Sequence, residues 1–338
     1  MAVGSPLLAR AGAVPADAPD AGVAWHYGDP LREQRRLATA AGWVDRSHRG
    51  VLRIPGADRL GWLHALLTQH VSELPSGRGA EALVLDPHGR VEHDLQLAED
   101  GTATWIDVEP GTAGDLLAYL ERMRFWSAVE PAESDTAVLS LVGPDTPAVL
   151  AAVGLPVPLS AYDVGVAGGV LVRRMPWPGP AAADLLLPRY DLVQWAARLD
   201  EAGATPAGTW AFEALRVQAR RPRLGRETDH KTVPHEVGWI DTAVHLQKGC
   251  YRGQETVARV QNLGRPPRRL VLLQLDGSGS ELPVHGDPVI LDGRVVGSVG
   301  TAARHWELGP IALAVVRRQV ADDDQLSVAG VPALIDPA

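Results

Sequence analysis

GVLRIPGADRLGWLHAL, residues 50–66, has the same pattern of residue types as AVLSLVGPDTPAVLAAV, residues 137–153. Each stretch begins with a short apolar run typical of a strand, and each continues through a small turn that contains Gly and Asp. Each then ends in apolar residues at helical spacing. This weak internal repeat predicts two related α+β units in the first two thirds of the chain.

The pattern of apolar and turn residues changes after residue 265. Short apolar runs separated by Gly/Asp turns continue to the end, and no helical pattern interrupts them. This part is typical of a small all-β barrel or sandwich. We therefore predict α+β units at 24–135 and 136–265 and an all-β unit at 266–338, preceded by a disordered, Ala/Pro/Gly-rich extension at 1–23.

Composition sets outer bounds on the kind of protein. A chain of 338 residues, 46% of them apolar, is expected to form two or three domains with real cores. It has no run of 18 apolar residues, so we expect no membrane helix, and the N-terminus shows no signal-peptide pattern. A single cysteine excludes an internal disulfide and suits a reducing cytoplasm.

Basic residues gather in one segment of an acidic chain. The net charge is −9, yet residues 214–269 hold twelve Lys and Arg against five Asp and Glu. A solvated arginine-rich face and a site for an anionic ligand or nucleic acid both account for this segment. Only two of the 32 basic residues are lysines, Lys231 and Lys248, which draws attention to the latter.

Lys248 lies two residues before the only cysteine, Cys250, and Arg252 lies two residues after it. In an extended segment all three side chains would share one face, and the two cations would favour the thiolate. The alternative is that Cys250 is a small buried filler. Nucleotide-binding, zinc-protease and Cys-x-x-Cys motifs are absent from the sequence, and the scattered histidines lead us to expect no metal site.

Residues 248–255, KGCYRGQE, resemble the K-G-C-[FY]-x-G-Q-E signature of YgfZ-type folate-binding proteins, which are related to the glycine cleavage T-protein. LRVQARRPRLGRE at 215–227 and VPHE at 233–236 resemble further segments of that family, and the likeness extends over roughly residues 23–334. The resemblance implies an α+β fold in three parts, with two related α+β units around a folate channel and a C-terminal β-barrel.

The resemblance also implies roles for individual residues. Cys250 would be a redox-active or ligating thiol, tuned by Lys248, and tetrahydrofolate or a derivative would be the cofactor. The candidate folate-binding residues are Arg216, Glu236, Trp239, Tyr251, Gln254, Glu255, Arg259 and Arg269. Among these, the arginines would meet the glutamate tail and the two aromatic rings would stack on the pterin.

Two departures from T-proteins bear on the mechanism. T-proteins carry a paired acidic Asp-Asp-Leu, where this chain has His93-Asp94-Leu95. They also carry a pterin-holding Glu at the position of Pro180. Both changes argue against glycine-cleavage activity, because a buried carboxylate is a charge-assisted partner for the pterin N–H groups.

Three functions follow from these observations. The first is an accessory protein for iron–sulfur enzymes or for tRNA thiomodification, which acts through Cys250. The second is a tetrahydrofolate-dependent one-carbon transferase, in which Asp94 or His93 acts near N5 or N10 of the folate. The third is an RNA-binding module based on the basic segment, with tRNA as its partner.

Overall fold

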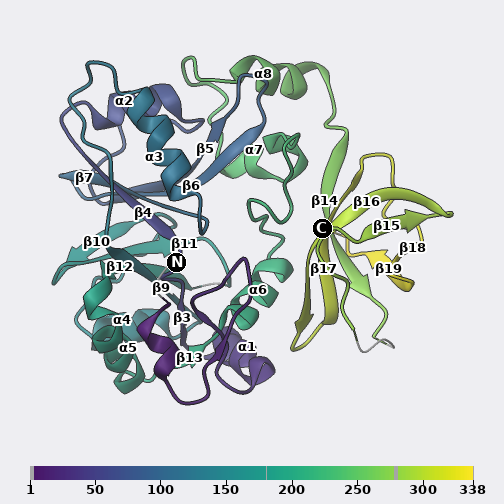
Figure 1. Ribbon diagram of the computed structural model, residues 1–338, viewed down its shortest axis with the longest axis horizontal. Helices are drawn as coiled ribbons and strands as arrows, with labels where there is room; N and C mark the ends of the chain where they lie inside the picture. Colours follow the sequence, from purple (N-terminus) through teal and green to yellow (C-terminus); the bar gives the residue numbers. More distant parts are fainter. Residues whose placement is uncertain (1–3, 180, 278–280, 338) are drawn as a thin grey trace.

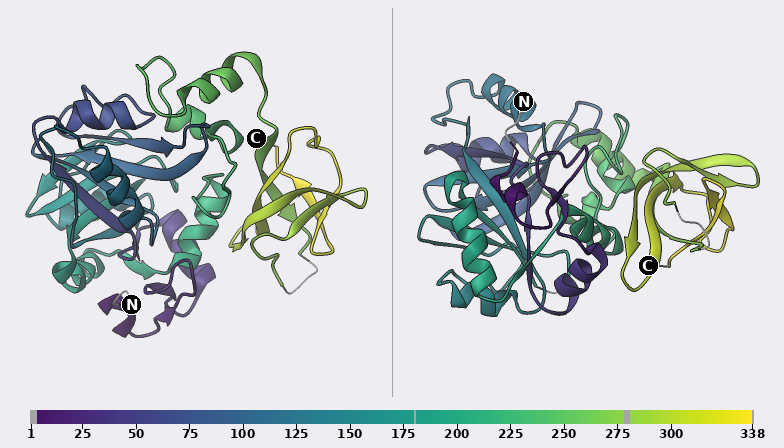
Figure 2. Two further views of the ribbon diagram at one scale, coloured as in Figure 1. Left: turned by 45° about the horizontal axis from the view of Figure 1, so that its top comes forward. Right: turned by 60° about the horizontal axis from the view of Figure 1, so that its bottom comes forward.

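The computed structural model describes residues 4–179, 181–277 and 281–337. Figure 1 shows an α+β body built on two sheets and, beside it, a β-barrel formed by the last part of the chain. The two parts remain side by side when the molecule is turned (Figure 2). The three-part fold that the sequence predicted is therefore confirmed.

The first sheet has five strands in the order β5-β6-β7-β4-β8, and helices α2 and α3 pack on one of its faces. Leu52, Leu63, Leu95 and Leu120 form part of the core between them. The bounds are β4 Gly50–Pro55, α2 Arg59–Leu66, β5 Arg78–Leu85, β6 Val91–Glu99, β7 Ala103–Val108, α3 Ala113–Arg122 and β8 Ala132–Glu133.

The second sheet has six strands in the order β10-β11-β12-β9-β3-β13. Its bounds and those of its helices are α1 Pro30–Thr39, β3 Gly42–Asp45, β9 Thr136–Val142, α4 Thr146–Ala152, β10 Val164–Ala167, β11 Val170–Met175, β12 Ala182–Pro188, η2 Arg189–Asp191, α5 Leu192–Glu201, β13 Thr205–Ala207 and α6 Thr209–Gln218. The repeated strand–turn–helix units are β4 with α2 and β9 with α4, as the repeat predicted.

The chain crosses between the two sheets early. Strand β3 precedes the first sheet in sequence, yet it pairs with β9 and β13 of the second sheet. The segment 24–135 is therefore not one structural unit, because its first strand completes the partner sheet. All four residues of β3 are buried, so the strand shows no alternation of buried and exposed positions, and its short sequence does not indicate which sheet receives it.

The N-terminal segment is packed onto the body. Its elements are η1 Pro6–Ala9, β1 Val14–Pro15 and β2 Ala24–His26, and the two strands form a small antiparallel hairpin. Leu7 is 1% exposed within the core of the second sheet. The predicted disordered extension is thus wrong for residues 4–23, because a few apolar side chains and one buried carboxylate hold this segment in place.

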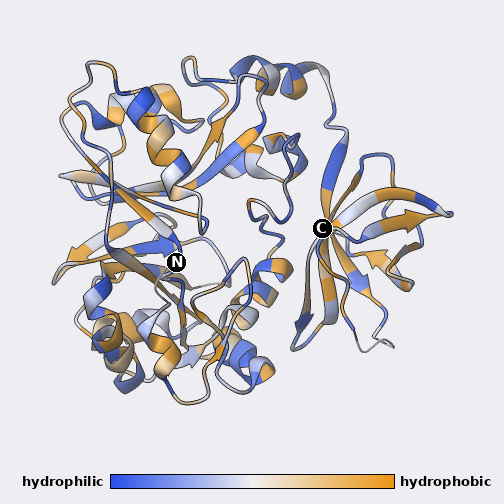
Figure 3. Cartoon of the chain, in the orientation of Figure 1, coloured by the Kyte–Doolittle hydropathy of each residue, from blue (hydrophilic) through white to orange (hydrophobic). Residues whose placement is uncertain are grey.

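A connecting segment leads from α6 to the barrel through η3 Pro234–Glu236, α7 Trp239–Thr242 and α8 Gln254–Leu263. The barrel strands are β14 Arg268–Leu275, β15 Pro288–Leu291, β16 Arg294–His305, β17 Gly309–Arg317, β18 Leu326–Val328 and β19 Val331–Ile335, closed in the order β14-β17-β16-β15-β18-β19. Figure 3 shows hydrophobic residues along the strands of both the body and the barrel. Within the described ranges no helix is long and apolar enough to cross a membrane.

Candidate functional site

A charged cavity lies inside the α+β body, where the two sheets face each other. Strands β6 and β12, helix α6, the connecting segment and the N-terminal segment all contribute to its wall. The cavity has a volume of about 30 Å³, room for only a few water molecules. Its charged lining residues are Asp20, Arg46, Arg49, Asp94, Glu109, Asp184, Glu213, Arg216 and Arg223.

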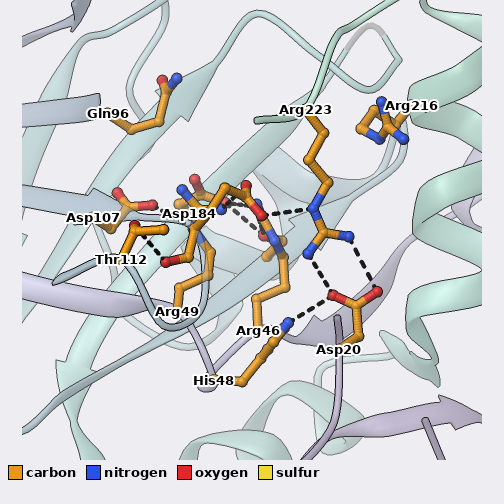
Figure 4. Close-up of polar contacts among 12 residues, drawn as sticks. Asp20, Arg46, His48, Arg49, Gln96, Asp107, Thr112, Asp184, Arg216 and Arg223 are labelled. Atoms are coloured by element: carbon orange, nitrogen blue, oxygen red, sulfur yellow. Dashed lines mark hydrogen bonds and ion pairs between the residues drawn. The ribbon is translucent and has the colours of Figure 1, made fainter. Parts of the chain in front are cut away.

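Ion pairs organise one side of this cavity (Figure 4). Arg173, fully buried, donates from one nitrogen to Asp107 at 2.6 Å and to Asp184 at 2.9 Å. Arg49 donates to Asp107 at 2.7 Å and to Glu109 at 2.6 Å. Burial opposes ionisation of Asp107, but the nearby Arg173 and Arg49 outweigh it and lower the pKa of this carboxyl.

Asp94 is the carboxyl group in the cavity that lacks such compensation. Burial first, and then the neighbouring Glu81, raise the pKa of Asp94 well above its ordinary value. The Oδ1 atom of Asp94 is buried and has no hydrogen-bond partner among the described residues. The raised pKa favours the acid form of Asp94, which is the form that can donate to a group inside the cavity.

Strand alternation separates Asp94 from its neighbour His93. Asp94 and Gln96 line the cavity, whereas Leu95 and Leu97 pack in the core under α2 and α3. His93 alternates in step with Leu95 and Leu97, so it lies on their face of β6, opposite to that of Asp94. Only Asp94 of this pair is placed to act in the cavity, which the dipeptide by itself did not decide.

Glu81 lies beside Asp94 and was missed in the sequence. It sits on β5 directly opposite Gln96, and its Oε1 accepts hydrogen bonds from Arg221 at 2.6 Å and from Gln96 at 3.3 Å. The Oε2 atom of Glu81 has no partner among the described residues. The available signal was a charged residue inside the apolar strand 78–85. Burying a charge costs free energy unless the charge is paired, so such a residue is a candidate for a specific contact.

The motif segment 248–255 lies away from this cavity and is held by Lys248. The Lys248 Nζ donates to the carbonyls of His64, Leu67 and Gln69, at 2.5 Å for Leu67 and 3.3 Å for Gln69. These carbonyls lie at and just beyond the C-terminal end of α2, where such groups lack helical partners and favour a cation. Burial lowers the pKa of Lys248 to about 8.

Cys250 is exposed to solvent, two residues from the buried Lys248. Arg252 instead pairs with Glu92 at 2.8 Å. The expectation that the three side chains share one face is wrong, because the segment forms turns, with Gly253 at φ +82°, and is not a strand. The alternative of a buried filler is wrong as well, since the thiol is open to solvent.

The other candidate residues are dispersed over the molecule. Arg216 lines the cavity and pairs with Glu213 and Glu227. The remaining candidates do not line the cavity. Trp239 and Tyr251 pack in a core under the motif, and Glu255 and Arg259 are exposed on α8. Glu236 binds Arg268, Gln254 donates to the Lys248 carbonyl, and Arg269 pairs with Asp322. Of the predicted set, only Asp94 and Arg216 line this cavity. Lys248, Tyr251 and Gln254 contact one another at the motif, and Glu236 and Arg269 line a separate pocket.

The basic segment 214–269 is largely neutralised by carboxylates, some within the segment and others from elsewhere in the chain. Arginines with such partners are Arg216, Arg220, Arg221, Arg223, Arg252, Arg268 and Arg269. Because these guanidinium groups are already paired, few of them remain to bind phosphates. In the part of the chain that the structure describes, no group of three or more His, Cys, Asp or Glu could hold a metal ion.

The role of Lys248 leads to a stability prediction. Lys248→Met is expected to lower the free energy of unfolding by about 1.5–3 kcal/mol, because three carbonyls lose a charged donor. Lys231→Met is the matched control; Lys231 is exposed, and its loss should cost less than about 0.5 kcal/mol. Urea unfolding of both variants measures the difference, and equal losses would remove the anchoring role of Lys248.

Comparisons with known proteins identify the family and the fold. The GCVT N-terminal domain family matches residues 7–248, and the glycine cleavage T-protein C-terminal barrel domain matches residues 268–331. An aminomethyltransferase from Rubrobacter xylanophilus is 31% identical over 300 residues, which cover 86% of this chain and 80% of that protein. An aminomethyltransferase from Symbiobacterium thermophilum is 29% identical over 297 residues, which cover 82% of this chain and 78% of that protein.

A solved structure has the same fold. The glycine cleavage system aminomethyltransferase T from Bartonella henselae superposes with a TM-score of 0.88, over 98% of this chain and 95% of that one, at 21% sequence identity. The family level of the predicted resemblance is confirmed, whereas the narrower YgfZ-type assignment stays a prediction. The chain belongs to the glycine cleavage T-protein family.

Proposed function

We propose that this protein binds tetrahydrofolate or a derivative at the charged cavity, which widens to admit it, and transfers a one-carbon unit, with Asp94 as the group that carries the proton. The observation that carries the proposal is the buried Asp94 carboxyl, whose pKa is raised by burial and by Glu81 and whose Oδ1 faces no partner in the described chain. Relatives that are named aminomethyltransferases support the reaction class.

The polar atoms around Asp94 suit a pterin ring. Glu81 Oε2 and Gln96 Oε1 are unpaired buried acceptors, and Trp177 Nε1 is an unpaired buried donor within the described residues. A pterin presents adjacent N–H donors and a carbonyl acceptor, which are complementary to this set. Glu81 would then supply the carboxylate that is absent at Pro180, a residue that lies outside the described ones.

The reaction class sets what Asp94 has to do. An aminomethyl thioether and tetrahydrofolate together yield methylene-tetrahydrofolate, ammonia and a thiol, with no change in oxidation state. The folate supplies the nucleophilic nitrogens, and the departing amine needs a proton. The acid form of Asp94 can deliver that proton, and burial together with the neighbouring Glu81 favours this form by raising the pKa of the carboxyl group.

The test is a single-turnover transfer experiment. An S-aminomethyl thioether is mixed with the protein and tetrahydrofolate, and methylene-tetrahydrofolate is quantified. We expect formation above the uncatalysed rate, together with binding of 5-formyl-tetrahydrofolate in isothermal titration. Binding without any transfer would reject the transferase and leave a folate-binding protein.

A second candidate is the accessory function for iron–sulfur enzymes or for tRNA thiomodification. It is favoured by one observation: Cys250 is exposed on a segment whose base is anchored by the buried Lys248. A thiol presented in this way is accessible to a client protein or to a metal in transit. Iron–sulfur client enzymes and tRNA are the partners that this candidate proposes.

Complementation tests the role of the thiol. Cys250→Ala is expected to fail to restore the activity of radical iron–sulfur enzymes, and the level of thiolated tRNA, in a strain that lacks its own YgfZ-type protein. Ser160→Ala, which removes an exposed hydroxyl outside the motif, would control for expression. Full rescue by Cys250→Ala would contradict a role of the Cys250 thiol in this function.

A further inference from the structure

The loop that follows α3 carries two aromatic rings into solvent. Trp126 is 98% exposed and Phe125 is 73% exposed, and the exposed Arg122 and Arg124 precede them in the chain. Aromatic side chains mostly pack inside a protein, because their burial removes a large apolar surface from water. Trp, Phe and Arg are also enriched at the centres of protein–protein interfaces. Residues 122–126, the aromatic tip, therefore have the composition of an interface anchor.

The body holds the aromatic tip from both sides. The Trp62 Nε1 donates to the Met123 carbonyl at 2.8 Å, and the Ala128 N–H donates to Asp58 Oδ2 at 2.7 Å. Phe125 has a φ of +44°, a left-handed conformation that costs free energy in a bulky residue. A loop that is fixed in this way before binding loses less conformational entropy when it docks on a partner.

An apolar pocket, the edge pocket, opens between the two sheets. Its volume is about 240 Å³, enough for an aromatic side chain, and its apolar wall consists of Trp105, Val166, Leu171, Leu186, Leu187 and Pro188. Val166 lies on the edge strand β10 and is 54% exposed. Strands β7 and β10 lie at the side of the body that faces away from the barrel (Figure 1). Exposed apolar surface of this kind marks an interaction site.

The aromatic tip and the edge pocket lie at the same end of strands β4 and β7. Pro55 at the end of β4 pairs with Ala103 at the start of β7. The Pro55 carbonyl also accepts a hydrogen bond at 3.1 Å from the N–H of Glu130, four residues after Trp126. Asp100, in the turn before β7, lines the pocket. A two-fold axis at this end therefore allows each copy of the chain to offer its tip to the pocket of the other.

The charge at the edge pocket complements the charge of the tip. Burial opposes ionisation of Asp100, but hydrogen bonds from Trp105, Thr102 and Ala103 outweigh it and lower the pKa of this carboxyl. The bond from Trp105 Nε1 to Asp100 Oδ2 measures 2.7 Å, so the anion is fixed beside the apolar wall. The pocket thus presents an anion next to an apolar surface, and the tip presents guanidinium groups next to aromatic rings.

We propose that a second copy of this chain covers this face, with Trp126 of each copy inserted into the edge pocket of the other. Arg124 then lies near Asp100 of the partner subunit. Two such contacts, related by the two-fold axis, form a closed dimer and not an open chain. The edge pocket and the charged cavity share no lining residue, so this inference does not depend on the proposed function.

Sedimentation equilibrium of the full chain over a concentration series tests the proposal. The wild type is expected to dimerise. Trp126→Ala removes the anchor, and Val166→Arg places a cation in the pocket where the tip arginines approach. Each change is expected to raise the dimer Kd at least about 100-fold, because it removes a central anchor from both contacts. Both side chains are exposed, so both variants should fold like the wild type.

Two barrel residues supply matched controls. Leu334 is 54% exposed on β19, and Val295 is 56% exposed on β16. Leu334→Ala removes an exposed apolar side chain, and Val295→Arg repeats the change made at Val166. Both controls should leave the dimer Kd at the wild-type value, because neither residue belongs to the tip or the edge pocket.

A mixture of the two variants tests the pairing of tip with pocket. Val166→Arg keeps its tip and Trp126→Ala keeps its pocket, so one of the two contacts can form between them. The mixture is therefore expected to contain heterodimers at concentrations at which either variant alone is monomeric. A dimer that forms through another surface would gain nothing from mixing.

Three results would overturn the proposal. The first is a wild type that stays monomeric up to about 1 mM, which is weaker than a specific interface of this kind should be. The second is dimerisation that Trp126→Ala leaves unchanged. The third is a mixture of the two variants that associates no more than the separate proteins do.

Discussion

Asp94→Asn is expected to reduce the single-turnover rate of one-carbon transfer by roughly 10²–10⁴-fold, the range that a positioned proton donor contributes. Asparagine keeps the size of the side chain but cannot give up a proton to the departing amine. Binding of 5-formyl-tetrahydrofolate should change far less, because the amide can still occupy the same position beside Glu81 and Gln96.

His93→Asn is the control for Asp94→Asn. His93 is the neighbouring residue on β6 but lies on the opposite face, so its replacement should leave the transfer rate near the wild-type value. The pH profile gives an independent readout. Since the acid form of Asp94 is the active one and its pKa is raised, the rate should fall as pH rises through that pKa. A full rate in Asp94→Asn, or a loss confined to His93→Asn, would contradict this assignment.

Arg173→Met is expected to lower the free energy of unfolding by about 3–5 kcal/mol, the largest stability change that we predict. Arg173 is 0% exposed, and its guanidinium bridges Asp107 of the first sheet and Asp184 of the second. Methionine fills much of the space but leaves both carboxylates with less compensation in the interior.

Arg189→Met is the matched control for Arg173→Met. Arg189 pairs with Asp135, whose side chain is 78% exposed, so the loss of this ion pair should cost no more than about 1 kcal/mol. Urea unfolding of the two variants gives the comparison. Equal losses would show that the bridge between the sheets adds nothing beyond an ordinary surface pair.

The elements that follow from local patterns were predictable. The strand–turn–helix repeat at 50–66 and 137–153 corresponds to β4 with α2 and to β9 with α4, and the short runs after residue 265 form the closed barrel. These features depend on hydrophobic period and turn residues, which act within a few positions of each other. The motif around Cys250 was likewise visible from its residues alone.

The ion pairs in and beside the charged cavity were not predictable in the same way. Asp20 and Arg223 are 203 positions apart, and Glu81 and Arg221 are 140 positions apart. In such a pair, the sequence around one residue does not indicate which distant residue is its partner. Both Asp94 and His93 were candidates, and the choice between them required knowing which face of β6 lines the cavity.

The sequence by itself determined the class of fold, the repeat, the barrel and the exceptional segment 248–255, because each depends on residues that are neighbours along the chain. Only the tertiary structure decided that Lys248 anchors a helix end, that Cys250 faces solvent, and that Asp94 lines a cavity close to the carboxylate of Glu81. The physical reason is that burial and charge pairing, which set the proton affinity and accessibility of a side chain, arise where distant strands meet.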